Sequence, residues 1–370
     1  MKSAAALLVP ALLGAQVAQF RVHETAGLRR FSYPVRGSFA TSHAPDGLRL
    51  LEEGKPVAAQ FTAREPGRVE VDFAASLGPH ESRRYRVDAG APAAAAEGMR
   101  VEETDSSYRV RHPNGLEFEV PRNLLGMLKA ARTPRTSYLL PDSQGLVAVY
   151  RDDIEFRAGG IGHWGTPTRS RVVKAGPLAC ALRFEGMQGL RGDRSVASVV
   201  EMEFPRSKSW VEIVWTVEDP QGFVSGLIAD LNLNIQGPPT LVDFGATSMA
   251  YVALRKDQAA SFVAAREGEW RIDVGGQPYA SGSGVGEGWA HVMDSERATA
   301  VALAEFTRAP GVSRERIDVS PQGRLVVRRD FRGGERKSLR FWLHFVGMPV
   351  QVGAATSPQS MQAPLEVVWE

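Results

Sequence analysis

The chain has 370 residues, 43% of them hydrophobic and 23% charged, which is typical of a globular protein and excludes one that is mostly disordered. Its 44 basic and 42 acidic residues leave a formal charge of +2, so no bulk field favours nucleic acid or an anionic membrane as partner. The single cysteine, Cys180, excludes a disulfide framework, and its apolar surroundings predict a buried thiol. The length suits two domains.

Residues 1–18 resemble a secretory signal peptide. Lys2 precedes an apolar run over residues 4–13, and Ala15 and Ala18 are the small residues that a cleavage site needs. The run is too short to span a bilayer as a mature helix, so we expect a secreted or periplasmic protein without a membrane span. The alternative is a buried N-terminal strand or helix.

Residues 19–90 predict a small domain of the β-barrel or sandwich type. Val69, Val71 and Phe73 alternate with acidic residues, as in a strand that buries one face. Residues 91–98 carry no large apolar side chain, and this composition predicts a linker between two domains.

Residues 99–370 predict a large antiparallel β-sandwich domain, so the expected fold class is all-β. The clearest hairpin is 195–218, where Val200, Met202 and Phe204 alternate with glutamates before a turn and a second apolar strand. A two-stranded ribbon cannot bury two apolar faces alone, so further sheet must stack against it. Further strands are predicted at residues 108–112, 116–120, 137–140, 146–150, 171–174, 178–185, 226–236, 249–255, 261–266, 270–274, 288–293, 299–306, 316–319, 324–329 and 338–346.

The short motifs that carry a built-in mechanism are absent from the sequence. It contains no GxGxxG opening a helix, no P-loop, no HExxH, no GxSxG and no paired CxxC, which argues against nucleotide-dependent chemistry, zinc proteolysis and α/β-hydrolase activity. No cofactor is expected. Calcium suits the carboxylates of acidic glycans, but the pair Asp152-Asp153 is too weak a pattern to define a site.

The loop at residues 157–171 is the first candidate site. It places His163 beside Trp164 among glycines, with Arg169 and Arg171 shortly after. An aromatic face can cover the C–H side of a pyranose, and an arginine can hold a uronate carboxylate through two hydrogen bonds. In a lyase, His163 or His291 would remove the proton while Arg169 or Arg171 neutralises the carboxylate. The alternative is a packed loop whose Trp164 fills the rim of the sandwich.

Residues 287–308 contain the second candidate site. Trp289 and His291 are two positions apart on one predicted strand, so they share a face and suit the binding and deprotonation of a sugar. Glu305 and Arg308 follow the next strand, the first as an acid or base and the second as a substrate ligand. The alternative is an edge histidine with its hydrogen bonds satisfied and a solvated glutamate.

Five segments resemble the exo-rhamnogalacturonan lyase (YetA-like) family. They are GLRL at 47–50, VAAQF at 57–61, the hairpin 204–217 continuing into EDP at 218–220, VSPQGRL at 319–325 and RFWLHF at 340–345. The resemblance spans nearly the whole mature chain. It implies a small RIFT-barrel-like domain, a galactose-mutarotase-like β-sandwich and action on pectic polysaccharide.

Family members continue into a helical toroid domain that helps to form the substrate cleft, and the sequence up to Glu370 holds no such domain. The resemblance then leaves the site either wholly on the sandwich or incomplete. No catalytic residue of the family is matched position by position, so the candidate residues rest on loop chemistry.

The sequence leaves three functions open. The first is an exported carbohydrate-active enzyme, a polysaccharide lyase or hydrolase that acts on acidic, pectin-like polysaccharide. The second is a non-catalytic glycan-binding module that uses the same aromatic and basic surface. The third is a structural protein of the cell envelope. In the first two, a polysaccharide or oligosaccharide is the partner.

Overall fold

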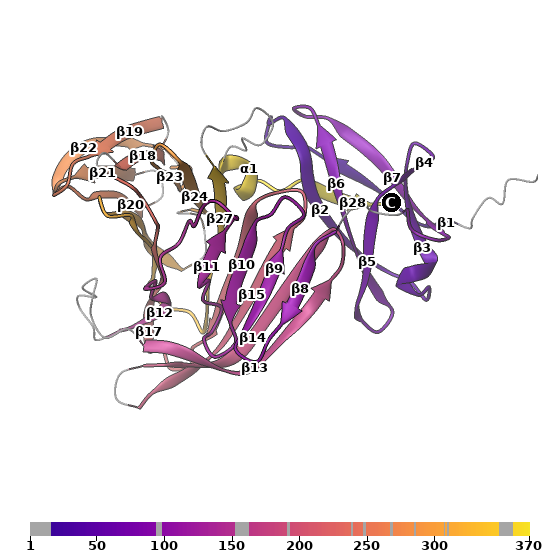
Figure 1. Ribbon diagram of the computed structural model, residues 1–370, viewed down its shortest axis with the longest axis horizontal. Helices are drawn as coiled ribbons and strands as arrows, with labels where there is room; N and C mark the ends of the chain where they lie inside the picture. Colours follow the sequence, from indigo (N-terminus) through magenta and orange to yellow (C-terminus); the bar gives the residue numbers. More distant parts are fainter. Residues whose placement is uncertain are drawn as a thin grey trace, which may run out of the picture. The chain divides into compact units, whose positions relative to one another are not determined.

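The computed structural model of the chain describes residues 16–93, 98–151, 163–190, 193–237, 240–246, 249–266, 269–284, 286–306, 308, 311–347 and 358–370. They form two compact units. Unit 1 contains the described residues up to Ala93 together with Leu365–Glu370, and unit 2 contains those from Gly98 to Pro364. The all-β fold expected from the sequence is confirmed in both units, which are built from antiparallel sheets (Figure 1).

Unit 1 is a sandwich of two antiparallel sheets. One sheet has the order β28-β1-β7-β3-β4 and the other β2-β6-β5, and over the described residues neither closes into a barrel. Phe20 and Tyr85 from the first sheet meet Phe73 from the second, with ring centroids 4.8–5.9 Å apart. The elements are β1 (Gln16–His23), β2 (Arg30–Ala40), a 3₁₀ turn at Pro45–Gly47, β3 (Leu48–Glu52), β4 (Lys55–Val57), β5 (Ala59–Glu65), β6 (Arg68–Leu77), β7 (Ser82–Ala89) and β28 (Glu366–Trp369).

The two ends of unit 1 differ from the expected division of the chain. The predicted leader lies outside the described residues up to residue 15, and residues 16–18 begin β1. The last strand, β28, was expected in the large domain but pairs with β1, where Trp369 lies opposite Phe20. Trp369 also packs on Phe20 and Phe39, with ring centroids 4.6 and 5.1 Å away. The C-terminal strand therefore completes the core of unit 1.

Unit 2 contains a four-stranded sheet and a 16-stranded sheet. Its elements are β8 (Arg100–Glu103), β9 (Ser107–Arg111), β10 (Glu117–Pro121), β11 (Ala130–Arg132), β12 (Gly145–Tyr150), β13 (His163–Ala175), β14 (Ala179–Gly189), β15 (Ser195–Pro205), β16 (Trp210–Glu218), β17 (Val224–Asn232), β18 (Thr240–Gly245), β19 (Met249–Leu254), β20 (Ala260–Arg266), β21 (Glu269–Val274), β22 (Gln277–Ser283), β23 (Trp289–Met293), β24 (Arg297–Leu303), β25 (Val312–Val319), β26 (Arg324–Phe331), β27 (Arg336–Gly347) and α1 (Pro358–Gln362).

The 16-stranded sheet folds back on itself. Its order is β19-β18-β23-β24-β27-β16-β15-β14-β13-β12-β17-β26-β25-β20-β21-β22, yet Phe244 on β18 lies 5.9 Å from Phe262 on β20, ring centroid to ring centroid. The two ends of the sheet therefore face each other across one core. The sheet β11-β10-β9-β8 covers β13–β15 in the same way, and Phe118 packs on Phe204 at 5.1 Å (Figure 1).

The predicted central hairpin is present as β15 and β16, which pair from Ala197 opposite Glu218 to Glu203 opposite Glu212. Its apolar face is completely buried and includes Trp215, whose indole nitrogen donates to the hydroxyl of Ser198 at 2.7 Å. Cys180 is also fully buried on β14, as the sequence predicts.

On β25 and β26, side chains point alternately into the core and away from it. Ile317, Leu325 and Val327 are completely buried and point into the core. The residues between them point outward, because successive side chains of a strand project to opposite faces. We call the side of the 16-stranded sheet that points away from this core its outer face.

Candidate functional site

Trp289 and His291, predicted from the sequence to share a strand face, lie together on β23 with ring centroids 5.6 Å apart. The Trp289 indole nitrogen donates to a carboxylate oxygen of Glu287 at 2.7 Å. Burial lowers the pKa of His291 to about 4, so its imidazole is neutral at neutral pH. A neutral imidazole can accept a proton.

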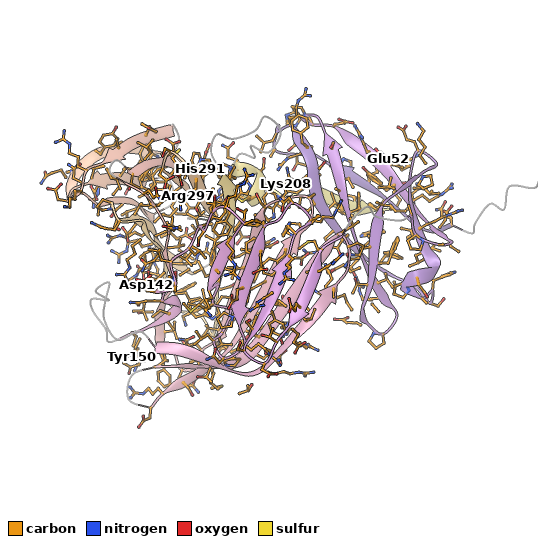
Figure 2. The ribbon with its side chains drawn as sticks, viewed as in Figure 1. Glu52, Asp142, Tyr150, Lys208, His291 and Arg297 are labelled. Atoms are coloured by element: carbon orange, nitrogen blue, oxygen red, sulfur yellow. The ribbon has the colours of Figure 1, made fainter. Side chains whose placement is uncertain are left out.

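His291 belongs to a row of cross-strand partners on the outer face. Asp243 lies opposite His291, Ala300 follows on β24, and His344 lies opposite Ala300 on β27. Burial raises the pKa of Asp243, and His344 is only 2% exposed. Figure 2 labels His291 near α1, whose residues contact β23 and β24. This row is a packed layer, in which Ala300 and His344 are buried and Asp243 and His291 are half-buried.

Glu305 and Arg308, the other two residues of this predicted site, do not lie with Trp289 and His291. Glu305 lies in an exposed turn after β24 with a left-handed φ of 51°, and its carbonyl accepts a hydrogen bond from the backbone N–H of Arg308 at 2.8 Å. Over the described residues, neither side chain hydrogen-bonds or ion-pairs with Trp289 or His291. The predicted strand over residues 299–306 ends at Leu303, which is why Glu305 leaves the sheet.

The first predicted loop is largely strand. His163 and Trp164 begin β13 opposite Ala148 and Val147, and their side chains lie outside the described part of the structure. Arg171 is exposed, with a guanidinium nitrogen 3.8 Å from Glu185 on β14. Its neighbour Arg169 lies opposite the same glutamate.

The two predicted sites are far apart. In the order of the sheet, β13 and β23 are separated by six ladder steps, or about 29 Å along the sheet at about 4.8 Å a step. The arginines expected to neutralise a carboxylate therefore do not lie beside His291. Arg169 and Arg171 are exposed on β13, and Glu305 and Arg308 are exposed in the turn after β24.

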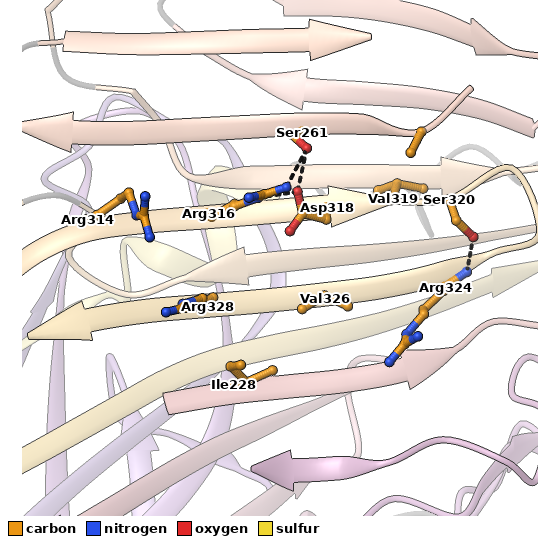
Figure 3. A pocket seen from close by; sticks show the side chains of 11 residues that line it. Ile228, Ser261, Arg314, Arg316, Asp318, Val319, Ser320, Arg324, Val326 and Arg328 are labelled. Atoms are coloured by element: carbon orange, nitrogen blue, oxygen red, sulfur yellow. Dashed lines mark hydrogen bonds and ion pairs between the residues drawn. The ribbon is translucent and has the colours of Figure 1, made fainter. Parts of the chain in front are cut away.

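A groove that the sequence did not predict lies on the outer face of β25 and β26 (Figure 3). Its volume is about 270 Å³, and its wall combines four arginines with an apolar strip. Its lining includes Ile228, Val326, Arg314, Arg316, Arg324 and Arg328. Ile228 and Val326 pack on Val147 and Val149, which gives the groove a firm apolar floor.

Aspartates orient the arginines. Arg328 and Arg314 donate from Nε to the two oxygens of Asp330, at 2.6 and 3.0 Å. Arg316 donates from Nε to Asp318 at 2.5 Å and from one terminal amino group to the hydroxyl of Ser261 at 3.1 Å. An arginine bonded through Nε keeps its terminal amino groups for another acceptor, and two parallel bonds from them match a carboxylate.

The fourth arginine, Arg324, forms a two-bond ion pair with Asp230 at 3.0 and 2.5 Å, and this hydrogen bonding raises the pKa of Arg324. The arginine side chains are 20–48% exposed, whereas the carboxylates are 2–26% exposed. The groove thus contains four guanidinium groups and three carboxylates, and the guanidinium groups are the more exposed to solvent. The groove therefore presents positive charge over an apolar strip.

The sequence carries a signal for this groove in the repeated pattern Arg-x-Asp, at residues 316–318 and 328–330. On a strand, residues two apart share a face, so each pattern predicts an arginine held by its own aspartate. The pattern alone does not tell which strands are neighbours, and only their pairing brings Arg316 opposite Arg328.

Among the described residues, no group of three or more histidine, cysteine, aspartate or glutamate side chains is placed to hold a metal ion. The weak calcium pattern Asp152-Asp153 lies outside the described residues. The same described part of the chain has no helix long and apolar enough to cross a membrane.

No protein-family model matches the chain, and neither does any curated protein. Among solved structures, a glycosyl hydrolase family 38 protein from Enterococcus faecalis is similar at a TM-score of 0.63 and 10% identity, over 95% of this chain and 47% of that one. An α-mannosidase from Enterococcus faecalis V583 is similar at a TM-score of 0.58 and 10% identity, over 95% and 46%. The chain thus spans less than half the length of either structure, and what it shares with them is the fold.

Proposed function

We propose that this chain is the saccharide-recognising part of a carbohydrate-active protein and that it binds acidic, pectin-like polysaccharide in the arginine-lined groove. The observation that carries the proposal is the groove itself, in which Arg314, Arg316 and Arg328 stand over an apolar strip. Guanidinium groups suit the carboxylates of uronates, and an apolar floor suits the C–H face of a pyranose. The folds named above, a glycoside hydrolase and an α-mannosidase, support a carbohydrate-related role.

The test is calorimetric titration with oligogalacturonides and with neutral galacto-oligosaccharides of the same length. We expect binding of the acidic series that weakens as salt is raised, since ionic contacts on a surface are screened. Arg316→Ala and Arg328→Ala should each lower the affinity about tenfold, the scale of one charge-assisted contact. Arg336→Ala is the matched control, because Arg336 is an exposed arginine paired with Glu218 on another strand. Equal affinities for wild type and both groove variants would refute the assignment.

Polysaccharide lyase or hydrolase activity is the second candidate, and the observation that favours it is the position of His291 beside Trp289, with ring centroids 5.6 Å apart. Lyase action leaves an unsaturated product that absorbs in the ultraviolet, and hydrolysis releases reducing ends. We expect any such activity to fall in His291→Gln while affinity at the groove stays unchanged. Binding without turnover would leave the chain a glycan-binding module. Failure to bind any glycan, together with a stable protein complex, would favour a structural role in the cell envelope.

Export is part of the proposal. Cleavage after Ala15 would leave β1 whole from Gln16, whereas cleavage after Ala18 would remove three residues of that strand. Mass spectrometry of the exported protein should therefore find Gln16 as its first residue. An exported protein that keeps residues 1–15 would contradict the leader.

A further inference from the structure

The groove is one part of a longer row of cross-strand partners. The row crosses the outer face of unit 2 from β12 to β22, and each member lies opposite the next. Its members are Val147, Ile228, Arg328, Arg316, Val263, Arg271 and Ser281. Because direct partners on neighbouring strands project to the same face, the three arginines stand on one line perpendicular to the strands.

Each arginine on this line is held in the same way. Arg328, Arg316 and Arg271 donate from Nε to the aspartate two residues later, at 2.6, 2.5 and 2.9 Å. The third pattern, residues 271–273, repeats the Arg-x-Asp of the groove on β21. In the described part of the chain, the terminal amino groups of Arg328 and Arg271 donate no further hydrogen bond. Three guanidinium groups are therefore each oriented by an aspartate on the same strand face, and at least two keep their terminal amino groups for a ligand.

Arg271 extends the positive charge beyond the groove. It does not line the groove, and it lies two ladder steps past Arg316, or about 10 Å. Its side chain is 59% exposed while its partner Asp273 is 18% exposed. Val263 stands between Arg316 and Arg271 in the row and offers a short apolar contact. The whole line of arginines covers about 14 Å, three ladder steps.

We propose that this row is a track for an extended acidic glycan that runs across the strands, with separate acidic groups bound at Arg328, Arg316 and Arg271. The inference rests on the proposed function of the groove. It adds that the ligand is a chain with acidic groups on more than one sugar. It also adds that contact with Arg271 makes the affinity depend on the length of that chain.

The experiment is a titration of the full chain with galacturonic acid oligomers of two and six sugars. Wild type should bind the hexamer at least tenfold more tightly than the dimer, because only the hexamer reaches Arg271. Arg271→Ala should lower the affinity for the hexamer about tenfold and bring it close to that for the dimer. Arg336→Ala serves again as the control and should keep the ratio of the two affinities.

The outcomes separate this inference from the proposed function. If Arg328→Ala weakens binding while the dimer and hexamer bind equally and Arg271→Ala changes nothing, the groove stands and the track is refuted. If neither oligomer binds wild type, the proposed function falls with it. A ratio above tenfold that Arg271→Ala removes and Arg336→Ala leaves intact supports the track.

Discussion

At the scale of single residues, the buried His344 predicts that the protein loses stability in acid. Burial, and then the charges of His291 and Lys208, lower the pKa of His344 to about 3, below the value of about 6.5 in an unfolded chain. The stability that the neutral ring supports is complete above about pH 6.5 and is lost as the pH falls toward 3. We expect protonation of this group to lower the free energy of unfolding by about 3 kcal/mol at pH 4, relative to neutral pH.

The measurement is urea unfolding of unit 2 between pH 4 and 7. His344→Phe keeps an aromatic ring beside Trp210, whose centroid is 5.9 Å away, and removes the titrating group. Its stability should fall less steeply with acid than that of wild type. His43→Phe, at an exposed histidine, should follow wild type. If the free energy of unfolding fell with the same slope toward low pH in both variants, the assignment to His344 would be contradicted.

A second residue-scale prediction concerns Gly245, which the layer around Trp289 requires. A Cβ at this position would lie 2.1–2.4 Å from atoms of the Trp289 indole. Gly245→Ala must displace the indole, and we expect a loss of about 1–3 kcal/mol, the usual cost of overpacking. The measurement is the denaturant midpoint of unfolding of Gly245→Ala. Gly333→Ala is the control, because a Cβ at Gly333 would have no atom within 4 Å. Equal midpoints would show that Trp289 moves freely.

At the scale of elements, the edge strands β19 and β22 are tied by one side chain. The hydroxyl of Tyr279 donates to the backbone carbonyl of Tyr251 at 3.0 Å, although these strands are the two ends of the 16-stranded sheet. Tyr279→Phe should cost under about 1 kcal/mol overall, since the bond is exposed. Hydrogen exchange should nevertheless quicken in β22. Tyr251→Phe keeps the accepting carbonyl and should not change that exchange, and equal rates in all three proteins would exclude the tie.

Strands with strong alternation could be predicted from the sequence, and strands that depend on distant partners could not. Residues 195–218 and 108–120 fold as expected, because their periodicity and turns are local. β28 carries only four residues, and its place is set by β1 far away in the chain. The groove could not be predicted for the same reason, because Arg316 and Arg328 become neighbours only when β25 pairs with β26.

At the scale of the whole molecule, unit 1 is built from both ends of the chain. Trp369 fills its core against Phe20 and Phe39, so truncation of that side chain should weaken β1 and its sheet. Trp369→Ala should cost about 2–4 kcal/mol, at the lower side of a fully buried tryptophan because Trp369 is half-buried. The loss should appear in unit 1 and leave unit 2 unchanged, because the six residues of the C-terminal segment belong to unit 1.

Hydrogen exchange resolved by segment separates the two units. The matched control is Val368→Ala, on the same strand but exposed, which should change protection of β1 little. Since β1 pairs with β28 on one side and β7 on the other, faster exchange should spread from β1 to β7 in Trp369→Ala. Uniform loss of protection in both units would mean that they unfold as one. Unchanged protection of β1 would mean that the C-terminal strand adds no stability to the N-terminal sandwich.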